Sequence, residues 1–105
     1  MKYRDNGKKV IIYLTGRIDA SNIAETECRI REILVGYTGY DAVLDASDLM
    51  YISSAGLRII MKISRIVDNK LRIINCTDEV YEIFCVTGFT DILDVNKASD
   101  GLLTE

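Results

Sequence analysis

Short apolar runs alternate along this chain with segments of helical periodicity, and this alternation limits the possible folds more than any other feature. Four runs rich in Val, Ile and Leu are typical of buried strands: residues 10–14, 42–45, 71–75 and 92–95. Residues 1–4 predict a further short strand, because the Asn6-Gly7 pair behind them is a strong hairpin signal. The segments between the runs repeat their apolar residues every three or four positions, as amphipathic helices do. The predicted order is β-β-α-β-α-β-α-β.

This order predicts an α/β fold, built as a single domain over residues 1–105. Strands that alternate with helices pair mostly in parallel through right-handed crossovers, and the initial hairpin adds one antiparallel strand. We therefore expect a mixed, mostly parallel sheet with helices packed on it. A chain of 105 residues can bury one core and has little to spare for a second.

Polar residues that commonly cap helices precede each helical segment. The three helices are expected to begin at Ser21 or Asn22, at Ser53 or Ser54, and at Thr77 or Asp78. Glu25 lies three residues after Asn22 and predicts a capping box at the first of these starts. The second helix is expected to run to about Asp68, and Gly88 to end the third in the left-handed conformation.

Each predicted helix has one apolar face for the core. The inward residues are expected to be Ile23, Ile30, Ile33, Leu34 and Tyr37, then Leu57, Ile60, Met61, Ile63 and Val67, then Val80, Ile83, Phe84 and Thr87. The second helix carries a basic stripe, Arg58, Lys62 and Arg65, which is either a solvated face or a contact for an acidic partner or membrane surface. Three segments complete the prediction: Thr15-Gly16 ends a strand, residues 47–53 form an irregular link, and residues 98–105 form a frayed helix.

Composition excludes several classes of protein. The net charge is −3, so a basic surface for nucleic acid is not expected. The chain has no His, which removes His-based triads, general bases and metal sites. Its three cysteines lack a CxxC spacing, and we interpret each as a reduced, small, buried apolar residue of a cytoplasmic protein. No apolar run has the length of a membrane helix or a signal segment, so no membrane association is expected.

Residues 45–57 give the strongest indication of a functional site. They follow a predicted strand, and ligands of open α/β sheets gather beyond the carboxyl ends of strands. Ser53-Ser54 also opens a predicted helix, whose N-terminus favours a phosphate group. The alternative is that one of these serines only caps the helix.

Catalytic chemistry has little support in the same region. The stretch Ser53-Ser54-Ala55-Gly56 lacks the leading Gly of a G-x-S-x-G elbow, and there is no His to act as its base. Lys62 lies about two helical turns beyond the serines, too far to activate them. Asp19, Asp45 and Asp48 resemble the acidic pocket of a phospho-aspartate receiver, or alternatively form turns and caps. The paired acids that a Mg²⁺ site needs are missing, so no catalytic residue, metal or cofactor is expected.

Four stretches resemble, in order, the signature of anti-sigma factor antagonists of the STAS domain family. Residues 14–19 are similar to the family's L-x-G-x-L/I-D pattern at the end of its second strand, and residues 24–26 stand at the usual place in the first helix. Residues 43–57 are similar to the core pattern, in which a strand leads through Asp and an aromatic residue to Ser, a small residue, Gly and Leu. Residues 80–84 and Gly88-Phe89 are similar to the last helix and its glycine. The core pattern is specific, and the match covers essentially the whole chain.

The resemblance implies an STAS-like partner switch. Such proteins bind an anti-sigma factor, often a serine kinase of the GHKL ATPase type, and so free a sigma factor. The kinase phosphorylates a serine at the start of the second helix, and a serine phosphatase resets it. By motif position the acceptor is Ser54, and Ser53 competes with it because it stands where many members carry Asp. The protein is expected to be a monomer or weak dimer.

The resemblance also implies a partner-binding surface around the acceptor serine. It comprises Asp19, Ser21, Asn22, Asp45, Ser47, Met50, Ser53, Ser54, Ala55, Gly56 and Arg58. Gly56 is expected to let a partner backbone approach the helix start. Two alternatives stay open: a non-switching STAS scaffold or assembly module in which Ser54 is only a cap, and a small enzyme, which the missing His disfavours.

Overall fold

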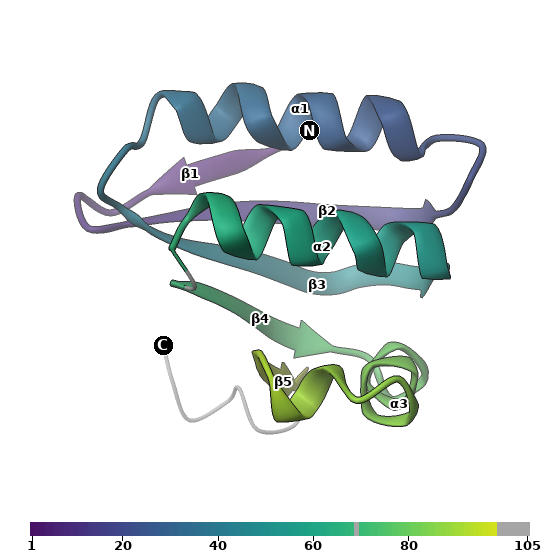
Figure 1. Ribbon diagram of the computed structural model, residues 1–105. Helices are drawn as coiled ribbons and strands as arrows, with labels where there is room; N and C mark the ends of the chain where they lie inside the picture. The colour runs from purple at the N-terminus through teal and green to yellow at the C-terminus, as the bar shows by residue number, and fades with distance from the viewer. Residues whose placement is uncertain (69, 99–105) are drawn as a thin grey trace.

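The computed structural model of the protein describes residues 1–68 and 70–98 (Figure 1). They form a five-stranded sheet with three α-helices and one short 3-10 helix. The elements in chain order are β1 (Tyr3–Asp5), β2 (Lys9–Ile18), α1 (Ile23–Val35), β3 (Asp41–Ile52), α2 (Ser54–Ile66), β4 (Leu71–Cys76), α3 (Asp78–Val86), η1 (Phe89–Asp91) and β5 (Asp94–Lys97). The predicted order of strands and helices is confirmed.

Each strand of the sheet pairs with its neighbour in the sequence. The strand order is β1-β2-β3-β4-β5, with β1 antiparallel to β2 and all other pairs parallel. The expected α/β fold with a mixed, mostly parallel sheet is therefore confirmed. Gly7, with φ +90°, occupies the turn between β1 and β2, where the Asn-Gly pair predicted a hairpin.

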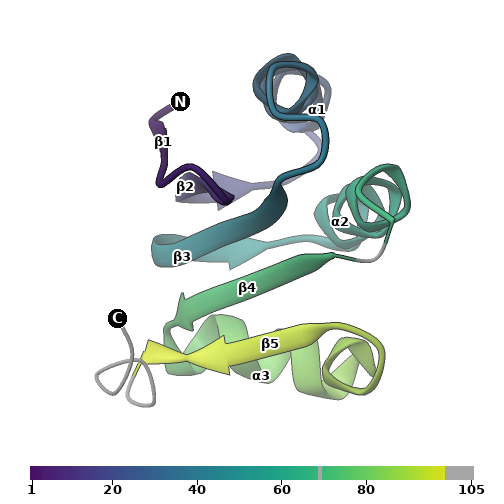
Figure 2. The ribbon, with the colours of Figure 1, turned by 90° about the vertical axis from the view of Figure 1, so that its left-hand side faces the viewer.

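Two of the helices cover one face of the sheet. Figure 1 shows α1 and α2 side by side, with their axes along the strands, and Figure 2 shows both on the same side of the sheet. The third helix, α3, lies beyond the end of β4, where it packs against β3 and β5. The sheet is bounded by β1 at one edge and β5 at the other.

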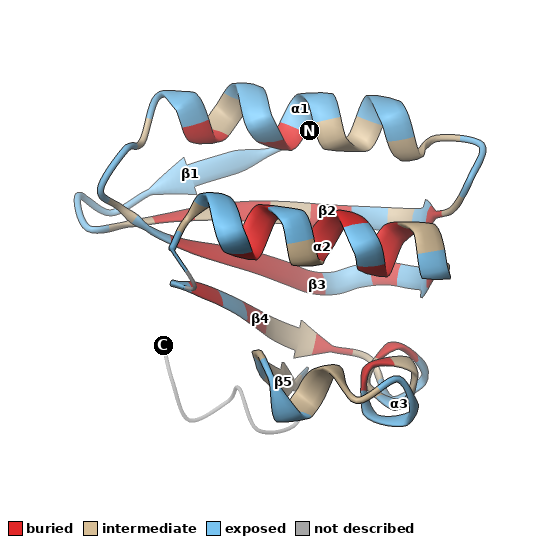
Figure 3. Ribbon diagram, viewed as in Figure 1, coloured by how far each residue is buried: buried red, intermediate tan, exposed pale blue. Residues whose placement is uncertain are grey.

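The core lies between the central strands and the helices (Figure 3). Ile12, Leu44 and Ile73 on the three central strands are fully buried. The inward faces of the helices contribute Ile30 and Leu34, then Leu57, Ile60 and Ile63, then Val80 and Phe84. The predicted inward residues are thus buried or partly buried, except for Thr87, which is exposed and donates its hydroxyl to the carbonyl oxygens of Ile83 and Phe84.

Two strands are longer than predicted. Thr15-Gly16 does not end β2, which continues to Ile18 through register shifts against β3, with Gly16 at φ +69°. Residues 47–53 are not an irregular link, because β3 runs without a break to Ile52. The extension is held by burial of Leu49 and Ile52, which join the core of the sheet. Beyond Asp45 it pairs only with β2, since the pairing with β4 ends there.

Three smaller predictions need correction. The first strand covers Tyr3–Asp5 rather than 1–4, and the last covers Asp94–Lys97 rather than 92–95, because η1 occupies the preceding residues and leaves Ile92 exposed. Of the three cysteines only Cys76 is buried, whereas Cys28 and Cys85 are exposed. Apart from Ala98, the tail predicted over 98–105 lies outside the described residues.

Candidate functional site

All three helices begin at the same end of the sheet. Strands β2, β3 and β4 are parallel, and each leads directly into the next helix, so their carboxyl ends and the helix N-termini share one edge (Figure 1). A helix N-terminus carries unpaired N–H groups and the positive end of the helix dipole. This edge is where the serines singled out in the sequence lie.

Ser53 is the N-cap of α2, and its groups are engaged in local structure. Its hydroxyl oxygen accepts a hydrogen bond from the N–H of Gly56 at 3.3 Å. Its own N–H donates to the carbonyl oxygen of Ile18 at 2.9 Å, and its carbonyl accepts from the N–H of Leu57 at 2.9 Å. Of the two serines predicted as caps, Ser53 is therefore the one that caps the helix.

Ser54 is the first residue of α2, and its side chain faces solvent. Its hydroxyl has no hydrogen-bond partner among residues 1–68 and 70–98. A phosphate attached at this point would lie beside the free N–H groups of the first helical turn. Arg58 lies four residues further along α2, also exposed, and so shares the same side of the helix.

The loop between β2 and α1 lies next to the start of α2. Asp19 accepts hydrogen bonds from the N–H of Ser21 at 3.0 Å and from its hydroxyl at 2.6 Å. These bonds, with Arg17 at 3.8 Å, hold the pKa of the Asp19 carboxyl below its ordinary value. The carboxylate is thus kept ionised in an exposed loop at the helix end.

Asn22 closes this loop instead of capping α1 through its side chain. Its side-chain oxygen accepts from the N–H of Asp19 at 3.0 Å, and its side-chain nitrogen donates to the carbonyl oxygen of Arg17 at 2.7 Å. The helix does begin after Asn22, but no side-chain cap hydrogen bond forms there. The capping box predicted with Glu25 is therefore wrong, because both side-chain groups of Asn22 are used inside the loop.

Two residues at this edge were absent from the predicted site. Arg17 and Tyr51 are register partners on β2 and β3, and the Arg17 guanidinium lies 4.5 Å from the centre of the Tyr51 ring. Met50, which was predicted, precedes Tyr51 on β3 and has 72% of its surface exposed. The signal that could have found this pair is the parallel register, which depends on the unpredicted extension of both strands.

Asp45, which was predicted as a partner contact, is buried. Asp45 accepts hydrogen bonds from the N–H and hydroxyl of Ser47, at 2.9 and 2.8 Å, and from the side-chain amide of Asn75 at 3.1 Å. These bonds tie the middle of β3 to the end of β4. Among the described residues no group of three acids, cysteines or histidines could hold a metal ion, so the receiver-like cluster of Asp19, Asp45 and Asp48 does not form.

Gly56 is buried beneath the start of α2. A Cβ at this position would lie 2.6 Å from Cγ1 of Ile52 and 3.0 Å from Cγ2 of Ile18. The expectation that this glycine makes room for a partner is wrong, because the space it leaves is occupied by the protein's own strands. It allows α2 to begin directly against the ends of β2 and β3.

The remaining predicted residues gather around the start of α2. The loop residues, the exposed Met50 and the first turn of α2 meet where Ile18 and Ile52 pair at the ends of β2 and β3. Those that are at least partly accessible there are Asp19, Ser21, Asn22, Met50, Ser53, Ser54, Ala55 and Arg58. Ser47 is also exposed, but it lies further back on β3 beside Asp45. No helix in the described parts of the chain is both long and apolar enough to cross a membrane.

Comparisons with known proteins agree with this architecture. A family model described as STAS domain matches residues 1–101. A comparison of the sequence with curated proteins finds no match. Among solved structures, a candidate anti-sigma factor antagonist from Thermotoga maritima, TM1081, is similar with a TM-score of 0.79 and 17% identity, over 96% of this chain and 90% of that chain.

Two further solved structures share the fold. The anti-sigma factor antagonist SpoIIAA in its unphosphorylated form has a TM-score of 0.71 and 13% identity, over 96% of this chain and 91% of that chain. The Bacillus cell fate determinant SpoIIAA in its phosphorylated form has a TM-score of 0.62 and 14% identity, over 96% and 95%. At these identities the likeness establishes a common fold.

Proposed function

Because the chain belongs to the STAS domain family, we propose that it is an anti-sigma factor antagonist whose binding is switched off by phosphorylation of Ser54. In this proposal the unphosphorylated protein binds an anti-sigma factor that is also a serine kinase of the GHKL ATPase type, and a sigma factor is released. A serine phosphatase restores the binding form. The protein acts by binding, and the chemistry of phosphate transfer belongs to its partners.

The observation that carries the proposal is the different state of the two adjacent serines. The Ser53 hydroxyl accepts the capping hydrogen bond from Gly56, whereas the Ser54 hydroxyl is exposed and has no partner in the described structure. A kinase can reach Ser54 without breaking the cap. Ser53 also performs the capping role that Asp performs equally well at an N-cap, so its presence where many family members carry Asp is compatible with the switch.

The position of Ser54 predicts that phosphorylation leaves the fold intact. The added group brings about −1.5 to −2 charges at neutral pH, and the N-terminus of α2 stabilises negative charge. The fold itself supports this, since SpoIIAA has been solved in both unphosphorylated and phosphorylated forms that share the architecture of this chain. The cost of the charge therefore falls on the interface with the partner.

The surface around Ser54 suits a protein interface. Met50 is 72% exposed, and the ring of Tyr51, the next residue of β3, lies 4.5 Å from the Arg17 guanidinium. Apolar and aromatic groups of this kind commonly form the centre of a protein contact. A phosphate at Ser54 would have to lose water inside that contact. A loss of a few kcal/mol of binding free energy in that contact lowers the affinity for the partner by about two to three orders of magnitude.

The test measures binding and folding on the same samples. Wild type, Ser54→Ala and Ser54→Asp are titrated calorimetrically against the anti-sigma kinase of the source organism, and circular dichroism follows their folding. We expect Ser54→Ala to bind and resist phosphorylation, and Ser54→Asp to bind more weakly while staying folded. Phosphopeptide mapping after kinase treatment should place the label on Ser54. Equal affinities for all three proteins would contradict the switch and favour the non-switching scaffold.

A further inference from the structure

We propose that the groove between α1 and the outer edge of β2 binds an extended, acidic segment of a partner protein by strand addition. The groove has a volume of about 1090 Å³ and lies between the N-terminal half of α1 and strands β1 and β2. This groove adjoins the surface around Ser54 and shares Arg17 and Asn22 with it, but the proposal does not depend on phosphorylation.

The outer edge of β2 is only half covered. On this side β1 pairs with Val10–Ile12, and the N–H of Tyr13 donates to the carbonyl oxygen of Lys2 at 3.0 Å. From residue 14 to 18, no strand in the described parts of the chain pairs with this edge, although β3 pairs with the other edge as far as Ile18. The Arg17 carbonyl oxygen already accepts a hydrogen bond from the Asn22 side chain at 2.7 Å, so the open part of the edge is residues 14–16. An unpaired strand edge is a template for an extended peptide.

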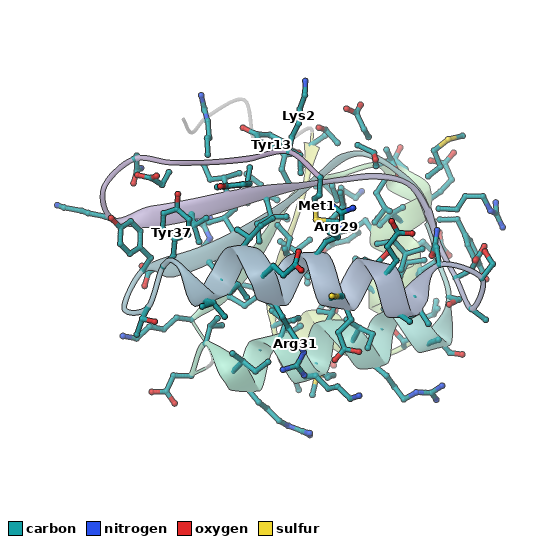
Figure 4. The ribbon with its side chains drawn as sticks, turned by 90° about the horizontal axis from the view of Figure 1, so that it is seen from above. Met1, Lys2, Tyr13, Arg29, Arg31 and Tyr37 are labelled. Atoms are coloured by element: carbon teal, nitrogen blue, oxygen red, sulfur yellow. The ribbon has the colours of Figure 1, made fainter. Side chains whose placement is uncertain are left out.

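Helix α1 forms the opposite wall of this opening. Asn22, Glu25, Thr26 and Arg29 line it along two turns of the helix. In Figure 4, which looks onto α1, Met1 and Arg29 lie between the helix and the strands, while Lys2 and Tyr13 lie farther from α1. A segment entering the groove would therefore lie between a helix and a strand edge.

The groove is basic in an acidic protein. Its lining includes four basic side chains, Lys2, Arg4, Arg17 and Arg29, against two acidic ones, Glu25 and Asp48. The whole chain has a net charge of −3. Arg29 lies 4.0 Å from Glu25 and Arg17 lies 3.8 Å from Asp19, whereas Lys2 and Arg4 form no ion pair within residues 1–68 and 70–98. The excess positive charge of the groove favours binding of an acidic segment.

The spread of the basic residues favours an extended occupant over a compact anion. A site for a small phosphate or carboxylate gathers its donors around one point, usually with partly buried side chains. Here the basic residues are distributed from Lys2, just before β1, to Arg29 in the middle of α1, and the side chains of Arg17 and Arg29 are 62% and 55% exposed. Tyr3 and Tyr13 lie between them and offer aromatic surface to the apolar side chains of a strand.

A fluorescein-labelled peptide of alternating Glu and Val, followed by fluorescence anisotropy, tests the charge requirement. We expect saturable binding to wild type, weakened about tenfold or more by Arg4→Glu combined with Arg29→Glu. Lys62→Glu combined with Arg65→Glu is the matched control, since these exposed residues of α2 lie outside the groove and the same number of charges is reversed. Circular dichroism checks that the variants stay folded. Equal weakening by the control variant, or no weakening by the groove variant, would overturn the proposal.

Two N-methylated versions of the same peptide test strand addition without altering the protein. Methyl groups on alternate backbone nitrogens block one edge of the peptide or the other. Only one of the two versions should lose binding, because only one edge of an added strand pairs with β2. Equal binding of both versions would exclude strand addition, and equal loss of both would show that the peptide does not bind as a regular strand.

Discussion

The N–H of Ser53 donates a hydrogen bond to the carbonyl oxygen of Ile18 at 2.9 Å, which joins the start of α2 to the end of β2. Asp19 follows Ile18 directly, and Ser54 follows Ser53. The bond therefore fixes the β2–α1 loop and the exposed serine relative to each other. A partner that contacts both meets a preorganised surface, which lowers the ordering cost of binding.

Replacing the two serines should separate capping from switching. Ser53→Ala removes the oxygen that accepts from Gly56 and should lower the free energy of unfolding by about 1 kcal/mol. Ser54→Ala removes an exposed hydroxyl and should change it by no more than about 0.5 kcal/mol. Urea denaturation of both variants measures this, and the reverse ranking would contradict the assignment of Ser53 as the cap.

Gly56 should tolerate no side chain. A methyl group there meets Cγ1 of Ile52 at 2.6 Å, so Gly56→Ala should destabilise the protein by about 1–3 kcal/mol through overpacking. Gly36→Ala is the control, since a Cβ at that helix end meets only the carbonyl oxygen of Ile33 at 3.6 Å. Thermal denaturation should show a lower melting temperature for the first variant alone. Equal melting temperatures would contradict the close packing.

Asp45 should matter for stability rather than for recognition. Asp45→Ala leaves the Asn75 side-chain amide and the Ser47 hydroxyl without their acceptor and should cost about 1–3 kcal/mol. Asp48→Ala, at an exposed position of the same strand, should change the free energy of unfolding by no more than about 0.5 kcal/mol. Denaturant titration compares them. Partner binding lost in Asp45→Ala at unchanged stability would restore a direct role in the interface.

The three thiols should differ in reactivity. Cys28 and Cys85 are exposed, whereas burial, with a smaller contribution from Asp45, raises the pKa of the Cys76 thiol to about 12. Labelling with a thiol reagent at pH 8 should modify the two exposed cysteines and reach Cys76 only after unfolding. Mass spectrometry of the labelled peptides identifies them, and rapid labelling of Cys76 in the folded protein would contradict its burial.

The same pKa shift makes a prediction about alkaline stability. In the unfolded chain the thiol ionises near its ordinary pKa of 9.0, whereas in the folded protein it stays protonated up to about pH 12. Ionisation therefore favours the unfolded state, and stability falls as the pH rises from about 9 towards 12. In Cys76→Ala this contribution should vanish, so its stability should fall less over that range than that of wild type.

Periodicity was enough to predict the order of the elements and most of the helix bounds. It failed in the second half of β3, where buried Ala46, Leu49 and Ile52 are separated by pairs of exposed residues. This spacing of three fits neither the alternation of a strand nor a helix. The strand forms because β2 shifts register beside it and continues to Ile18, and such a shift between two strands is not visible in either strand alone.

For the candidate site, too, the sequence predicted some features and missed others. The motif and the helix start located the serines, but which serine caps the helix depends on backbone geometry at Ser53. Asn22 was expected as a possible cap of α1, but its side-chain nitrogen donates to the carbonyl oxygen of Arg17 near the end of β2. The role of Gly56 depends on Ile18 and Ile52, which approach it only in the folded protein. Contacts between distant segments therefore account for these errors.

The strand order β1-β2-β3-β4-β5 has a consequence for how the chain reaches its native state. Since every strand pairs with its neighbour in the sequence, no strand has to insert between two that are already paired. Only β1 and β2 close a short loop, while each parallel pair is joined through one α-helix, so every pairing belongs to one local unit of the chain. The chain also has no proline, so its refolding lacks the isomerisation step that takes tens of seconds in many domains. The native state can therefore form without an existing strand pair having to open first.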